Sequence, residues 1–99
     1  MTRPFYADYV NHCLRFYSRE VKVVKVDAIV DIMNWQAVHN VLSKLPEINQ
    51  EIIKDIYSRG DTLADNIFQV SKERELDPLK VWTMISKITK QIAKERELI

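Results

Sequence analysis

The sequence has 99 residues, a length that fits one domain. Hydrophobic residues make up 46% and charged residues 29%, a balance that is typical of globular proteins and argues against disorder. One Gly and three Pro are too few for the turns of an all-β domain, and they exclude a glycine-rich phosphate-binding loop. We therefore expect an all-α fold, a compact bundle of four or five helices that forms a single domain over residues 1–99.

The charges nearly cancel, because 15 Lys and Arg residues against 14 Asp and Glu residues give a net charge of +1. The total charge therefore does not indicate nucleic acid, and a basic surface requires an uneven distribution. A single cysteine, Cys13, excludes an internal disulfide and a cysteine-based zinc site. No apolar run resembles a signal peptide or approaches the ~18 residues of a membrane span. We expect a cytoplasmic protein that does not bind membranes.

The N-terminal segment predicts a helix over about 4–19. Aromatic and thiol side chains recur there at three- and four-residue spacing and share one face of the helix: Phe5, Tyr9, Cys13 and Phe16. The next residues, 21–26, form a short β-branched run, which we expect to be an extended connection or an edge-like segment.

Two helices are predicted in the middle of the chain. The first runs from near Ala28 or Asn34 to Lys44, and Asn34 is a candidate cap at which this helix breaks. The second begins after Pro46, because proline fits the first turn of a helix. Gly60 is expected to end it by adopting the left-handed conformation that closes many helices.

The two remaining helices have clear start signals. Asp61 or Thr62 is expected to cap the next helix, and Asp65, three residues after Thr62, makes a capping-box-like arrangement. We expect Phe68 on the buried side of this helix, which fades in the charged run that follows. An Asp-Pro pair at Asp77 predicts the start of the last helix, which runs to about Arg96.

The last helix separates apolar from basic side chains. An apolar stripe about 60° wide must face a core, and it consists of Val81, Ile85, Ile88 and Ile92. The opposite arc of roughly 100° contains four lysines and no acid, and we call it the lysine face: Lys80, Thr83, Lys87, Lys90, Gln91 and Lys94. Lysines that neutralise phosphates release counterions, and Thr83 and Gln91 have polar groups for base edges or phosphates. Taken alone, this face is somewhat better explained as an ordinary solvated surface.

A family resemblance adds to this pattern. The segment Leu45-Pro-Glu-Ile-Asn-Gln-Glu-Ile-Ile-Lys-Asp-Ile-Tyr57 resembles the helix that opens the fourth conserved region of bacterial sigma factors. Leu63 and Ile67 resemble the first helix of that family's helix-turn-helix, and Lys80-Val81-Trp82-Thr83-Met84 resembles its recognition helix. Similar patterns occur in small sigma-like regulators of phages and mobile elements in Gram-positive bacteria. The resemblance covers about half of the chain, from Leu45 onward.

The resemblance implies a small DNA-binding transcription regulator with a helix-turn-helix-like pair within about 46–97. It implies that Lys80 and Thr83 contact duplex DNA, and that Lys87 and Lys90 belong to the basic part of the recognition helix. Three features depart from the family pattern. Glu75 stands near the position of the usual glycine, the spacing from Ile67 to Asp77 is about one helical turn longer than in the family, and Trp82 replaces a basic residue.

Dense aromatic residues near the N-terminus indicate an alternative function. These aromatic residues alternate with arginines, a combination that can stack on nucleic acid. Aromatic residues and Arg are also enriched in protein interfaces, and we favour the interface interpretation here. Tyr6 and Tyr17 fall off the apolar stripe of their helix, and Trp82 is a third interface candidate. The alternative to a DNA-binding regulator is therefore a helical protein-interaction module, as a homodimer or with another protein, that does not bind nucleic acid.

No pattern indicates catalysis, a metal or a cofactor. Adjacent residues on a helix point about 100° apart, so His12 and Cys13 do not chelate as a pair, and His39 has no partner ligand nearby in sequence. Asp27 and Asp31 share a helix face, but such pairs are usually solvated or act as caps. We expect no enzymatic activity, no cofactor and no small-molecule substrate.

Overall fold

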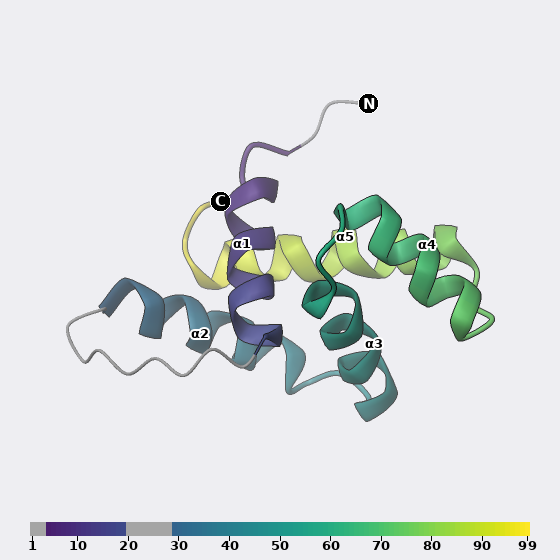
Figure 1. The fold of residues 1–99 in the computed structure, drawn as a ribbon. Helices are drawn as coiled ribbons and strands as arrows, with labels where there is room; N and C mark the ends of the chain where they lie inside the picture. Colours follow the sequence, from purple (N-terminus) through teal and green to yellow (C-terminus); the bar gives the residue numbers. More distant parts are fainter. Residues whose placement is uncertain (1–3, 20–28) are drawn as a thin grey trace.

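The computed structural model describes residues 4–19 and 29–99. Within them lie five helices, α1 (Ala7–Ser18), α2 (Ile29–Leu42), α3 (Glu47–Ser58), α4 (Leu63–Glu73) and α5 (Pro78–Glu95), and no strand (Figure 1). The prediction of an all-α bundle of four or five helices is thereby confirmed. The predicted connection at 21–26 lies outside the described residues. None of the five helices combines the length and apolar character that crossing a membrane requires.

The helices share one hydrophobic core, in which α1 and α5 are central. Helix α1 contacts α2, α3 and α5, while α5 also contacts α2 and α4. All five helices contribute side chains that are at most 3% exposed, among them Val10, Leu14, Val38, Leu42, Ile53, Ile56, Tyr57, Ile67, Val70, Ile85, Ile88 and Ile92. Burying each such aliphatic side chain contributes about 1.5–3 kcal/mol, so this shared core fixes which side of each helix faces outward.

The connection between α3 and α4 differs from the prediction at Gly60. Helix α3 ends at Ser58, Arg59 is extended with φ −77° and ψ 151°, and Gly60 does not have a positive φ. The backbone oxygen of Arg59 accepts a hydrogen bond from Nδ2 of Asn66 in α4 at 3.2 Å, so an extended residue tied to the next helix replaces a left-handed closure. Of the two expected caps of α4, Thr62 is the one used, since the N–H of Asp65 donates to Oγ1 of Thr62 at 3.2 Å.

The turn between α4 and α5 contains a left-handed residue that is not glycine. Glu75 has a φ of 55°, and the N–H of Leu76 donates to the backbone oxygen of Ser71 at 2.8 Å, as in a Schellman closure. Asp77 then caps α5 through a 3.0 Å hydrogen bond from the N–H of Leu79, as predicted. A non-glycine residue in this conformation costs about 1–2 kcal/mol.

The predicted break at Asn34 is wrong, because α2 is continuous from Ile29 to Leu42. Asn34 is buried, and its Oδ1 accepts hydrogen bonds from the hydroxyl of Tyr9 at 3.1 Å and from Nε of Arg96 at 2.6 Å. The side chain that suits a cap in isolation therefore links three segments that are distant in sequence.

The predicted apolar sides of α1 and α4 also need correction. Around α1, Phe5 is 80% exposed and Tyr9 39% exposed, while the face that packs inward is formed by Val10, Cys13 and Leu14. In α4, Phe68 is 62% exposed. Each of α1 and α4 has two neighbouring faces that carry apolar side chains at helical spacing. In both helices the aliphatic face is the one that packs against α3 and α5.

Candidate nucleic-acid interface

The structure places the six predicted side chains of the lysine face together on the outer side of α5. Lys80, Thr83, Lys87, Lys90, Gln91 and Lys94 are all exposed. The opposite stripe is buried, with Val81, Ile85 and Ile88 each 3% exposed and Ile92 fully buried. Because this stripe packs against α1, α2 and α4, the lysine face is directed away from the core.

The charge of this face is not neutralised by neighbouring side chains. Within residues 4–19 and 29–99, none of its four lysines forms an ion pair. The ion pairs of that part of the chain lie at the junction of α3 and α4, where Arg59 contacts Asp55 at 3.0 Å and Glu73 at 2.6 Å, and Arg74 contacts Asp55 at 3.3 Å. Positive charge is therefore paired at that junction and unpaired on α5.

The two uncharged polar residues of the lysine face, Thr83 and Gln91, differ in whether their hydrogen-bond donors are available to a ligand. Oγ1 of Thr83 donates to the backbone oxygen of Leu79 at 2.9 Å, so its hydrogen is used within the helix. Phosphate oxygens need donors, and Thr83 does not present one in this rotamer. The amide of Gln91 has no partner among the described residues and keeps both donors and acceptor.

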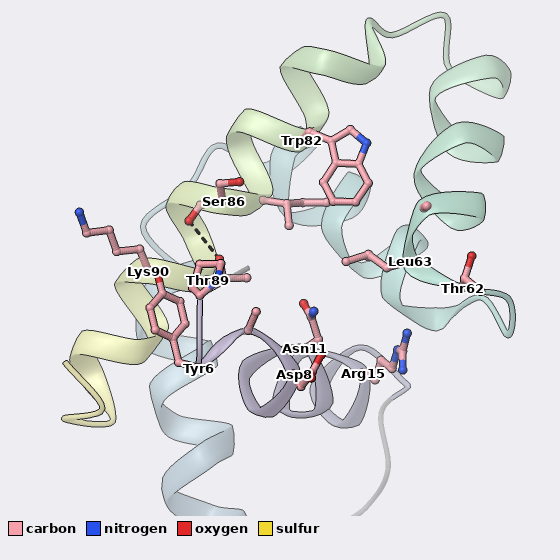
Figure 2. A pocket seen from close by; sticks show the side chains of 14 residues that line it. Tyr6, Asp8, Asn11, Arg15, Thr62, Leu63, Trp82, Ser86, Thr89 and Lys90 are labelled. Carbon is pink, nitrogen blue, oxygen red and sulfur yellow. Dashed lines mark hydrogen bonds between the residues drawn. The ribbon is translucent and has the colours of Figure 1, made fainter. Parts of the chain in front are cut away.

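The three predicted interface residues separate into two places. Tyr6 and Trp82 line one cleft of about 1040 Å³ between α1, the start of α4 and α5, which we call the Trp82 cleft (Figure 2). Tyr17 instead packs against Trp35 of α2, with 5.4 Å between ring centroids, and its hydroxyl lies 3.0 Å from Nδ1 of His39. Burial raises the pKa of Tyr17. The structure thus brings two of the three together.

Sequence reasoning missed two features of these surfaces. His39 stacks on Trp35 at 4.7 Å with 11° between the ring planes, and Lys54 lies 5.7 Å from the ring centroid of Tyr17. The four-residue spacing of Trp35 and His39 was the available signal. The second feature is Asn11, a buried polar residue beside the Trp82 cleft, which follows only from long-range packing.

The soft metal ligands do not form a reactive or metal-binding site in the described part of the chain. Cys13 is buried, and burial raises the pKa of its thiol to about 11, which disfavours the reactive thiolate at neutral pH. No group of three or more His, Cys, Asp or Glu residues in this part could hold a metal ion. Asp27 of the predicted carboxylate pair lies outside the described residues.

Comparison with protein-family models, with curated proteins and with solved structures finds no match to this chain. The resemblance to the sigma-factor region therefore rests on the quoted residues alone.

Proposed function

We propose that this protein binds duplex DNA through the lysine face of α5, as a small regulator of transcription in the cytoplasm. The observation that carries the proposal is the concentration of four exposed, unpaired lysines on one helix face in a chain with a net charge of +1. Elsewhere in the described residues, arginines pair with carboxylates at the α3–α4 junction. Unpaired cations on one face are the arrangement that a phosphate backbone attracts.

Counterion release sets the expected strength of this interaction. Four neutralised phosphates give a slope of about −3.6 for the logarithm of the association constant against the logarithm of salt concentration. The affinity is then expected to fall roughly 100-fold between 50 mM and 200 mM salt. A steep salt dependence of this size distinguishes phosphate contacts from apolar association.

The local geometry around α5 is compatible with a helix-turn-helix-like pair. The turn from Arg74 to Asp77 is short, and such motifs join their helices by turns of three or four residues. Glu75 has the left-handed conformation that the glycine of the resembled family would supply. This departure from the family pattern therefore leaves the turn intact, and it supports α5 as the helix that contacts DNA.

Fluorescence anisotropy with a random-sequence duplex, at low and near-physiological salt, tests the proposal. The double variant Lys87→Glu with Lys90→Glu is expected to lose binding by 100-fold or more at low salt. The matched control is Arg19→Glu with Lys44→Glu, which changes the net charge equally at two exposed positions outside the lysine face. Equal losses in both variants would show that total charge, and not this face, determines binding.

A second candidate function, a protein-interaction module, is favoured by a different observation. Trp82 is 39% exposed, and with Tyr6 it lines a cleft that meets the lysine face at Lys90. Exposed aromatic side chains in a recess are typical anchors of protein interfaces. The cleft and the lysine face are neighbouring surfaces of α5 that share Lys90, so the two functions are tested separately.

A further inference from the structure

The Trp82 cleft is a three-sided recess whose walls come from distant parts of the sequence. Helix α1 forms one wall, the start of α4 a second, and α5 the third (Figure 2). The side chains of Trp82 and Leu63 both lie in the space between α5 and α4 (Figure 2). Ile85, a core residue, also lines the recess. The apolar part of the lining therefore offers an anchor site for apolar side chains of an occupant.

Asn11 lies beside this apolar region, and its side-chain amide is a donor that no described residue engages. Asn11 is only 7% exposed, and its Oδ1 accepts a 2.8 Å hydrogen bond from the hydroxyl of Tyr57. Its amide is directed into the cleft, and within the described residues no partner engages Nδ2 (Figure 2). Nδ2 is not among the buried atoms that lack a partner, so it is open to the cleft, where an occupant that brings an oxygen acceptor can receive its hydrogen bond in place of solvent.

Cations flank the recess on two walls. Arg15 of α1 is partly buried and extends toward Leu63, while Lys90 of α5 stands at the border between the cleft and the lysine face (Figure 2). Neither side chain forms an ion pair with another described residue. Asp8 is the acid of the lining, and it already has an interaction of its own. Two cations against one acid give the lining a net positive charge, which favours an occupant that carries negative charge.

The size of the recess fits a short helical segment. A helix about 10 Å in diameter that rises 1.5 Å per residue occupies about 120 Å³ per residue. The recess, about 1040 Å³ in volume, therefore has room for side chains from one face of a bound helix. Helices commonly bind in grooves through an apolar stripe, and their flanking charges then meet the rims.

We propose that the Trp82 cleft binds an acidic amphipathic helix of a partner protein. Apolar side chains of that helix pack on Trp82 and Leu63, and its carboxylates accept hydrogen bonds from Arg15 and from Nδ2 of Asn11. This inference rests on the protein-interaction function proposed above, and it is independent of duplex binding.

Fluorescence of Trp82 provides the test. The full-length Trp35→Phe variant, in which Trp82 is the remaining tryptophan, is titrated with two synthetic 18-residue amphipathic helices. Both peptides carry the same leucine stripe, flanked by Glu in one and by Lys in the other. The acidic peptide is expected to shift the Trp82 emission to shorter wavelength in a saturable manner, and the basic peptide is expected to leave it unchanged.

Charge reversal then locates the contact. Arg15→Glu is expected to weaken binding of the acidic peptide at least tenfold, and the control Lys94→Glu, on the lysine face away from the cleft, less than threefold. Equal losses in the two variants would overturn the proposal, because bulk charge would then explain binding. Equal binding of both peptides would overturn the acidic partner but keep the cleft as an interaction site. No shift with either peptide, or displacement of the acidic peptide by duplex DNA, would remove the cleft from the protein-interaction function.

Discussion

Helices α2 and α5 contact each other in the core, but their outward sides are opposite in character. The outer side of α5 carries lysines, whereas the first turns of α2 expose Ile29 at 65%, Val30 at 56% and Met33 at 45%. The inward side of α5 is a regular aliphatic stripe, while α2 is held in part by the buried amide of Asn34. An amphipathic pattern thus orients α5 by itself, and α2 takes its orientation from its partners.

The largest expected effect is on the free energy of unfolding, when a buried isoleucine of α5 and an exposed isoleucine of α2 are each replaced. Ile92→Ala removes a fully buried side chain of α5 and is expected to lower the free energy of unfolding by about 2–5 kcal/mol. Ile29→Ala on the outer side of α2 is expected to change it by at most about 0.5 kcal/mol. Urea unfolding followed by circular dichroism measures both. A loss above 2 kcal/mol for Ile29→Ala would show that the outer side of α2 is covered in solution.

The second prediction concerns Cys13, whose thiol pKa is raised by burial and responds to charges from both sides, at Arg96 and Asp31. Its pKa is about 11 in the folded protein and 9.0 in the unfolded chain, so the folded state holds the thiol proton more tightly. The stability that comes from keeping this thiol protonated is present below pH 9 and is lost as the pH rises through about 11.

Urea unfolding at pH 8, 9, 10 and 11 checks this dependence. Cys13→Ala lacks the thiol, so its stability is expected to fall less steeply over that range than that of the parent protein. Parallel curves for the two proteins would contradict a thiol that stays protonated in the fold.

The third prediction contrasts the outer sides of α2 and α5 in DNA binding. Lys87→Gln with Lys90→Gln removes two cations and is expected to reduce the magnitude of the salt slope by about 1.8, with a roughly 60-fold loss of affinity near 0.1 M salt. Ile29→Gln with Met33→Gln is expected to leave both quantities unchanged. Anisotropy titrations at four salt concentrations measure the salt slopes. A change in the slope or the affinity of the α2 variant would show that the duplex also contacts α2.

The smallest effect tests how α2 is held. Asn34→Ala removes the acceptor for the hydroxyl of Tyr9 and for Nε of Arg96, and it is expected to cost about 1–2 kcal/mol, because both partners reach some solvent. Gln36→Ala, at an exposed position of the same helix, is the control and is expected to be nearly neutral. Thermal unfolding compares them. Similar midpoints would mean that apolar packing alone orients α2.

Local signals in the sequence were sufficient for most helix ends and for the orientation of α5. Asp77 and Thr62 cap their helices as predicted, because a cap depends on residues within three positions. The stripe that contains Ile85 and Ile88 fixes the buried side of α5 through its period alone. The exposure of the lysine face follows directly from that stripe.

Features that depend on distant residues could not be predicted in the same way. In α1, the face of Tyr9 and the face of Leu14 are both apolar, and contacts with α3 and α5 choose between them. The interior position of Asn34 depends on Arg96, which is 62 residues away. The Trp82 cleft requires three helices to meet, so Asn11 gave no sequence signal of its place there.

The pairing of Arg59 and Arg74 with acids at the α3–α4 junction has a consequence for how the protein approaches other molecules. A nearly neutral chain that keeps one cationic face has little long-range attraction toward a polyanion, but it experiences a torque that turns this face forward within the Debye length of about 10 Å at 0.1 M salt. Salt shortens the Debye length, so we expect it to weaken this orienting effect and to lower the rate of productive encounter with DNA. Orientation, more than attraction, is what the charge distribution provides.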